Sequence, residues 1–232
     1  MSHRLRLVAI AVAAVIAWPL LAQDGTVVAS GTGTVELEAD RAIVNIAIES
    51  RGETASAAGI ANAGVAAQVR AALGTIDLPM TAVTTAHYDI QTNWRRQDGE
   101  RIPDGYRAVL SLRVAVNDVT RVGTIIDTAL TGGATRVDGI EFSSSRAEAA
   151  RAEAAALAVK DAMRTAEAIA TAAGGSLGDV IELTTQGNVS PMPEVRRFRA
   201  VEAMAADVPT VVTPGALTIS AYVNGRWRFE AR

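Results

Sequence analysis

Residues 146–173 of the chain read RAEAARAEAAALAVKDAMRTAEAIATAA. Alanine has the highest helix propensity, so this run predicts the longest helix of the chain, and the two glycines that follow it mark its end. Oppositely charged residues three positions apart support the helix, as in Glu148 with Arg151 and Asp161 with Arg164. Alanine also permits close packing, so we expect an interface with a sheet or a neighbouring subunit along this helix.

On both sides of this helix the sequence alternates apolar and polar residues, as β-strands do. Residues 42–50, AIVNIAIES, place Val44, Ile46 and Ile48 on one side of such a strand. An Asp98-Gly99 pair predicts a hairpin turn. The expected order is strands over 27–38 and 42–50, a helix ending near 73, strands over 80–94 and 106–116, a helix over 119–130, a strand over 136–145, the long helix, and strands over 177–185 and 216–229.

This order of elements predicts an α+β architecture, with largely antiparallel sheets and helices packed on one face. Each ββα or αββ unit is too small to bury its apolar face alone, so we expect two such halves to pack together. We assign residues 23–232 to one domain. Within it, residues 187–214 hold four of the seven prolines and predict a loop or short-helix excursion.

The first 22 residues have the pattern of a secretory signal peptide. Arg4 and Arg6 precede an apolar run over 7–21, and Ala22 stands at its exit. A membrane anchor is the alternative, but a spanning helix needs roughly 20 apolar residues. Leu20 is larger than usual for its place before the cleavage site, which leaves the exact site open. We expect an exported protein of a bacterial periplasm.

The side-chain inventory narrows the chemistry. The chain has no cysteine, two histidines and a formal charge of −3. A disulfide framework, a zinc knuckle and a thiol nucleophile all need cysteine. We see no metal constellation and no cofactor motif, and the charge argues against nucleic acid as a partner. We therefore expect no catalytic, cofactor-binding or metal-binding residues.

Two short motifs raise catalytic hypotheses that we weigh against plainer interpretations. His87 and Asp89 would share one face of a strand, but the sequence has no Gly-x-Ser-x-Gly elbow to supply a nucleophile. We favour an edge-strand pair and keep a hydrolase centred on His87 as a second alternative. Gly31 and Gly33 precede a strand and lack the lysine of a phosphate loop, so we expect them to allow a bend or a close backbone approach.

Six residues are candidates for interaction. Trp94 and Arg95 lie near the expected hairpin turn, where a tryptophan among arginines can form a cation–π pair or anchor a contact. In the excursion, apolar residues recur every three to four positions over 194–206 beside basic ones, which predicts a short amphipathic helix. A solvated loop, a subunit contact and the surface of the outer or inner membrane stay open for it. The candidates in this segment are Arg196, Arg197, Phe198 and Met204.

Several stretches resemble the SIMPL-domain family, formerly called DUF541. These are Ser30-Gly31-Thr32-Gly33, Asp40-Arg41-Ala42 (with Ala39 in place of the family's proline), Tyr106-Arg107-Ala108, Ile140-Glu141-Phe142 and Pro214-Gly215. The resemblance covers roughly residues 27–229. It implies the family's fold and a bacterial periplasm, an association with oxidative-stress defence, and the large ring-like or channel-like oligomer of one member. It brings no catalytic residues, because the family has no settled activity.

Taken together, we expect a non-enzymatic exported protein that acts by oligomeric assembly or binding, in envelope or oxidative stress defence. We expect a homo-oligomer. The first alternative is a module that binds a small ligand or a protein partner near the excursion, and the sequence does not identify that ligand.

Overall fold

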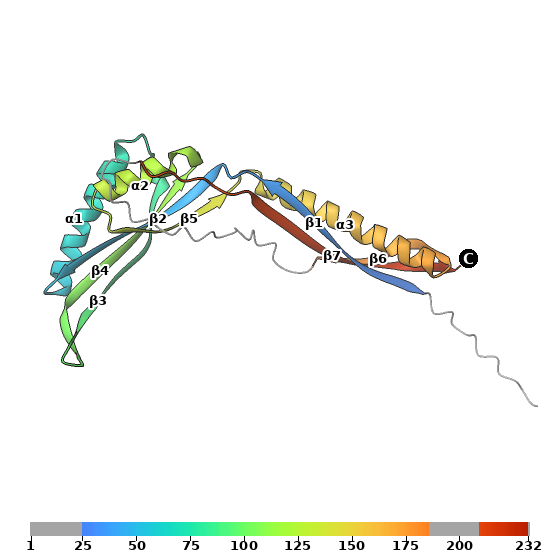
Figure 1. The fold of residues 1–232 in the computed structure, drawn as a ribbon, viewed down its shortest axis with the longest axis horizontal. Helices are drawn as coiled ribbons and strands as arrows, with labels where there is room; N and C mark the ends of the chain where they lie inside the picture. The colour runs from blue at the N-terminus through green and yellow to red at the C-terminus, as the bar shows by residue number, and fades with distance from the viewer. Residues whose placement is uncertain (1–24, 186–208, 232) are drawn as a thin grey trace, which may run out of the picture.

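The first strand of the chain lies beside the last. The computed structural model describes residues 25–185 and 209–231, and it shows an elongated, bent molecule with two regions (Figure 1). One region, which we call the arm, holds β1 (Thr26–Leu37), α3 (Ala147–Ala172), β6 (Gly175–Thr185) and β7 (Leu217–Ala231). Its sheet has the order β1-β7-β6, and both strand pairs are antiparallel.

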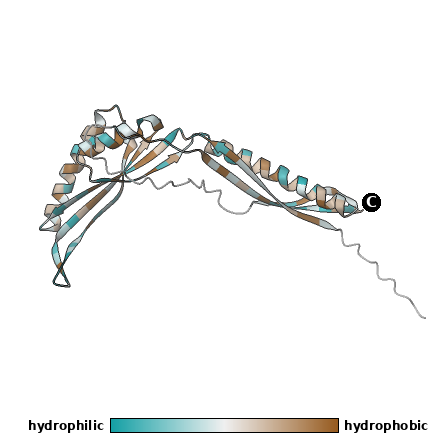
Figure 2. Cartoon of the chain, viewed as in Figure 1, coloured by the Kyte–Doolittle hydropathy of each residue, from teal (hydrophilic) through white to brown (hydrophobic). Residues whose placement is uncertain are grey.

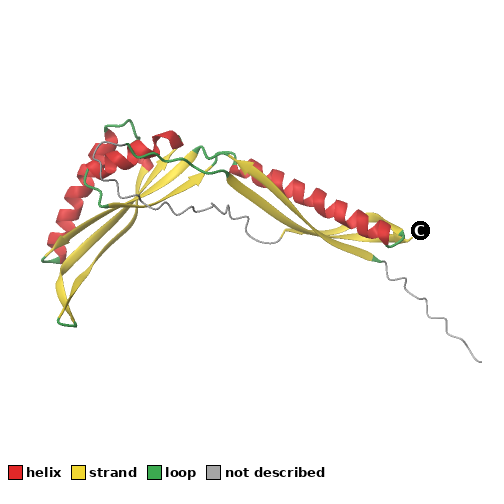
Figure 3. Cartoon of the chain, viewed as in Figure 1, coloured by secondary structure: helices red, strands yellow, loops and turns green. Residues whose placement is uncertain are grey.

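The other region, the head, is built from the chain between β1 and α3. Its antiparallel sheet has the order β3-β4-β2-β5. α1 (Ala55–Gly74) and α2 (Val122–Thr131) cover one face of this sheet (Figure 3). Single 3-10 turns at Met80–Ala82 and Val119–Arg121 precede β3 and α2. The strands are β2 (Arg41–Gly52), β3 (Val83–Gln97), β4 (Glu100–Val116) and β5 (Arg136–Ser143).

The predicted α+β class with antiparallel sheets and helices on one face is confirmed. The head is formed by one continuous stretch of the chain, from β2 to β5. The arm is formed by the stretches that come before and after it, β1 on one side and α3, β6 and β7 on the other. Apolar residues follow the strands beneath the helices in both regions (Figure 2). In the head, Val44, Ile46 and Ile48 of β2 are fully buried, as their alternation predicts.

The helix α1 is held to the sheet by a buried polar side chain. Thr54 caps the helix by accepting a hydrogen bond from the N–H of Ala57 at 3.1 Å. Within the helix, Asn62 is fully buried, and its amide donates to the carbonyls of Ile48 at 2.9 Å and Ala108 at 3.3 Å. These bonds fix the helix across two adjacent strands.

The alanine helix packs on the arm through one row of alanines and two glycines of β1. A Cβ atom at Gly31 would lie 2.2 Å from the backbone nitrogen of Ala162, and one at Gly33 would lie 2.1 Å from the carbonyl oxygen of Ala154. The backbone of α3 therefore rests directly on β1, and the predicted close backbone approach is confirmed. The buried row consists of Ala150, Ala154, Ala158, Ala162, Ala166 and Ala170.

Side-chain contacts tie the head to the chain segments that lead into the arm. Asp40, between β1 and β2, accepts hydrogen bonds from the backbone N–H of Ser145 at 2.7 Å and from its hydroxyl. Asp127 of α2 accepts from the N–H of Thr210 at 3.1 Å and from its hydroxyl. The three segments that run between the two regions are thus held at two points.

Candidate interaction surfaces

The hairpin of β3 and β4 extends beyond the helices of the head (Figure 1). Asp98 and Gly99 have φ values of 51° and 86°, so the predicted Asp-Gly turn is confirmed. Trp94 is 47% exposed, and the guanidinium carbon of Arg101 lies 5.5 Å from the centre of its ring, within cation–π range. Arg95 forms an ion pair with Asp104 at 3.5 Å. The tip is therefore ordered by local contacts, and its role as a contact anchor stays a prediction.

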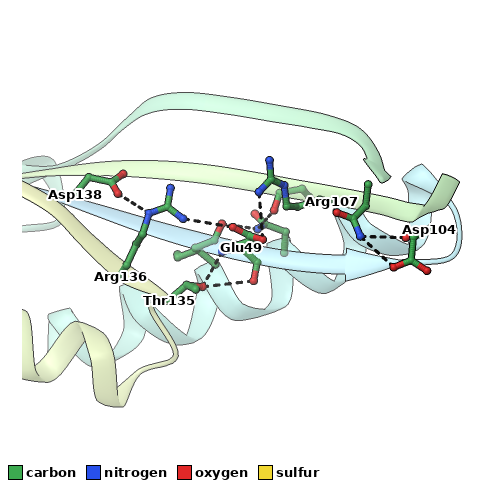
Figure 4. Close-up of polar contacts among 10 residues, drawn as sticks. Glu49, Asp104, Arg107, Thr135, Arg136 and Asp138 are labelled. Atoms are coloured by element: carbon green, nitrogen blue, oxygen red, sulfur yellow. Dashed lines mark hydrogen bonds and ion pairs between the residues drawn. The ribbon is translucent and has the colours of Figure 1, made fainter. Parts of the chain in front are cut away.

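The open face of the head sheet, opposite its helices, carries a polar network. The carboxylate of Glu49 on β2 lies between Arg107 of β4 at 3.6 Å and Arg136 of β5 at 3.3 Å (Figure 4). Arg136 also contacts Asp138 at 2.6 Å, and these carboxylates, Asp138 foremost, raise the pKa of its guanidinium. Glu49, Arg107, Arg136 and Asp138 are thus paired across three strands, which stabilises this part of the open sheet.

His87 lies on β3 opposite Ser111 of β4. Directly opposed residues in an antiparallel pair have neighbouring side chains, so the fold brings a hydroxyl near the imidazole. Among the described residues, no hydrogen bond joins His87 to Asp89 or to Ser111. The bond that links a nucleophile to its base is thus not formed between these side chains.

A hollow of about 400 Å³ lies beside β1, between the free edge of this strand and α3. The backbone N–H of Thr32 points away from β7 and donates to the carboxylate of Asp161 on α3 at 3.1 Å. Asp161 also pairs with Arg164. We call this hollow the edge groove; its lining consists of Thr32, Gly33, Thr34, Leu157, Lys160, Asp161 and Arg164. We did not infer it from the sequence, although the Asp161–Arg164 pair was expected and is confirmed.

Two carboxylates, Asp40 and Asp161, make the stability of the folded chain sensitive to acid. The hydroxyl and N–H of Ser145 lower the pKa of Asp40, and the N–H of Thr32 with Arg164 lowers that of Asp161. A depressed pKa stabilises the folded state above the unfolded value of about 3.9 and ceases to do so as the pH falls through the folded value. We expect the melting temperature to fall below about pH 4, and less steeply in Asp40→Asn and Asp161→Asn variants. If the melting temperature changed equally steeply with pH in the parent and in both variants between pH 2.5 and 6, this assignment would be contradicted.

The remaining candidates, Arg196, Arg197, Phe198 and Met204, lie outside the described residues. Within the described part, no group of three or more His, Asp or Glu side chains is arranged to hold a metal ion. No helix among the described residues is both long and apolar enough to cross a bilayer.

These features define a class of α+β protein built from two open antiparallel sheets, each covered by helices on one face. The model of the SIMPL family, described as a protein of unknown function (DUF541), matches residues 27–227, so the chain belongs to this family. The chain is 28% identical over 209 residues to the 26 kDa periplasmic immunogenic protein of Brucella abortus, covering 87% of this chain and 84% of that protein. The same-named protein of Brucella melitensis gives the same identity and coverage.

A more distant relative comes from Escherichia coli K12. The uncharacterised protein YggE is 25% identical over 175 residues, covering 75% of this chain and 71% of that protein. The predicted family is therefore confirmed, and relatives from Brucella are named as periplasmic proteins.

Proposed function

We propose that this chain is an exported periplasmic protein that acts without catalysis, by self-assembly. Location is supported by the periplasmic relatives in Brucella and by the signal-like first 22 residues. The family resemblance suggests a role in envelope or oxidative stress defence. Because the sequence has no cysteine, it has no thiol with which to reduce an oxidant, so a protective effect would be indirect.

One observation carries the assembly proposal. The arm exposes large apolar side chains on its outer strands: Val28 is 59% exposed on β1, and Val180, Ile181 and Leu183 on β6 are 49%, 51% and 45% exposed. Apolar side chains gathered on one element are a mark of interaction surfaces. A second protein surface packed over these strands would remove these apolar side chains from water.

Light scattering coupled to gel filtration tests the proposal on the protein purified from the full-length gene. We expect a particle whose mass is a multiple of one chain at micromolar concentration. A strict monomer up to about 100 μM would contradict self-assembly, since weak specific complexes fall in the micromolar range.

A binding module is the second candidate, and the path of the chain favours it. The excursion leaves from Thr185 at the end of β6 in the arm, and the chain is anchored again where Thr210 contacts Asp127 in the head. The two ends of this segment therefore lie in different regions of the molecule. A thermal-shift screen of small ligands tests this, and deletion of residues 187–213 should abolish every shift that the intact protein gives.

A further inference from the structure

The hairpin of β3 and β4 brings two arginines together near its turn. Arg96 of β3 and Arg101 of β4 are directly opposed in the register of the two strands, so their side chains are neighbours on one face of the hairpin. Trp94 lies on the same face, because it stands two residues before Arg96 and its ring contacts the guanidinium of Arg101. All three side chains are exposed. We call Trp94, Arg96 and Arg101 the cationic face of the tip.

The carboxylates of the two strands lie on the opposite face of the tip. Arg95 and Gln97 flank Arg96 along β3, so they point away from the cationic face. Glu100 is the register partner of Gln97, and Asp104 forms an ion pair with Arg95 at 3.5 Å. The cationic face therefore presents two positive charges and an indole ring, while the acidic side chains of both strands face the other way.

The two opposed arginines have no counter-charge in the part of the chain that the structure describes. Neither Arg96 nor Arg101 forms an ion pair there, and this includes Asp98 in the turn between them. Like charges directly opposite each other destabilise a strand pair. The tip thus keeps a local electrostatic cost that an anion from another molecule would remove.

A second opposed pair of arginines shows how the head sheet balances such charges elsewhere. Arg51 of β2 is the register partner of Arg107 of β4, and the carboxylate of Glu49 lies 3.6 Å from Arg107. Glu49 stands two residues before Arg51, so it shares the same face of β2. The carboxylate that accompanies this pair has no counterpart on the cationic face.

The side chains of the cationic face fit the phosphate groups of a lipid surface. Guanidinium groups bind phosphate through paired, charge-assisted hydrogen bonds. A tryptophan ring is amphipathic and is enriched at the level of lipid headgroups. A free phosphate ion would engage the arginines and leave Trp94 in water, where it is 47% exposed. The hairpin also extends beyond the helices of the head, so its tip reaches a flat surface before they do (Figure 1).

We propose that the cationic face of the tip docks on anionic phospholipids at a membrane surface, with Arg96 and Arg101 on lipid phosphates and Trp94 among the headgroups. This inference goes beyond the proposed self-assembly and does not depend on it. Two cations and one ring give a weak and reversible contact, which salt weakens further.

Co-sedimentation with vesicles tests this docking. In low salt, we expect the protein to bind vesicles made of equal parts of phosphatidylglycerol and phosphatidylcholine, and to bind pure phosphatidylcholine at least about tenfold more weakly. The tryptophan emission should shift to shorter wavelength on binding, because the ring of Trp94 leaves water. Trp227 is already 1% exposed and contributes no such shift, so Trp94→Phe should abolish it.

Two neighbouring arginines on opposite faces give a matched pair of variants. Arg96→Gln should weaken binding to the mixed vesicles about fivefold, and adding Arg101→Gln should bring the loss to at least about tenfold. Arg95→Gln removes the same charge one residue away and should bind within about twofold of the parent, because Arg95 already pairs with Asp104. All these side chains are exposed, so an unchanged melting temperature should accompany each variant.

Three results would overturn the inference. Equal weakening by Arg95→Gln and Arg96→Gln would mean that net charge, and not the cationic face, draws the protein to the vesicles. A parent protein that binds neither kind of vesicle would remove the lipid surface as the partner. Binding of inorganic phosphate or polyglutamate without binding to the mixed vesicles would assign the tip to a free anion or an acidic protein instead. Self-assembly is measured separately by light scattering, so each of these results leaves the proposed function standing.

Discussion

Replacing Gly33 with valine should destabilise the arm by at least about 3 kcal/mol, the upper part of the range for overpacking. A Cβ there would meet backbone atoms of α3 at 2.1 and 2.6 Å, and backbone cannot turn aside as a side chain can. The helix would have to lift from β1 and would uncover the row of buried alanines. We expect a marked drop in the urea midpoint, followed by circular dichroism.

Gly64 provides the control for this substitution. It lies inside α1, and an added Cβ would meet nothing within 4 Å. Gly64→Ala should raise stability by about 0.5–1 kcal/mol, because alanine favours a helix interior over glycine. An unchanged midpoint in Gly33→Val would show that α3 does not rest on β1 in solution.

Truncation of Trp227 should have a second large effect, about 3–5 kcal/mol for Trp227→Ala. This side chain is 1% exposed and packs with Val27, Ala29 and the C-terminal part of α3. Its indole nitrogen has no hydrogen-bond partner among the described atoms, so phenylalanine at this position loses volume without leaving a donor unpaired. Trp227→Phe should therefore be much milder than Trp227→Ala.

Trp94→Ala is the matched control, because Trp94 is 47% exposed at the hairpin tip. Surface substitutions usually change stability by less than about 0.5 kcal/mol. Equal losses from Trp94→Ala and Trp227→Ala in urea unfolding would contradict the assignment of Trp227 to the core of the arm.

Local patterns were sufficient for most elements of this fold. Alanine content predicts α3, alternation predicts the buried face of β2, and Asp98-Gly99 predicts the hairpin turn. Strand partners depend on distant parts of the chain, so no local pattern shows that β1 pairs with β7. The edge groove could not be predicted from the sequence for the same reason, since the hydrogen bond from Thr32 to Asp161 joins residues 129 positions apart.

The interaction candidates show a similar division. Composition around the turn singled out Trp94 and Arg95, and the structure supplies their partners, Arg101 and Asp104. The partner of an exposed hairpin tip is another molecule. Neither the composition nor the geometry of a single chain identifies that partner beyond its chemical class.

The pairing of Thr26 with Arg228 also has a consequence for the order of folding. The head consists of one continuous segment and makes its contacts over shorter loops, which close with less loss of entropy. β1 is synthesised first, yet it lacks its neighbour until the last strand has been made. Contact order therefore makes the arm the late-forming part of the molecule, and β1 stays unpaired on both sides while the head is already folded.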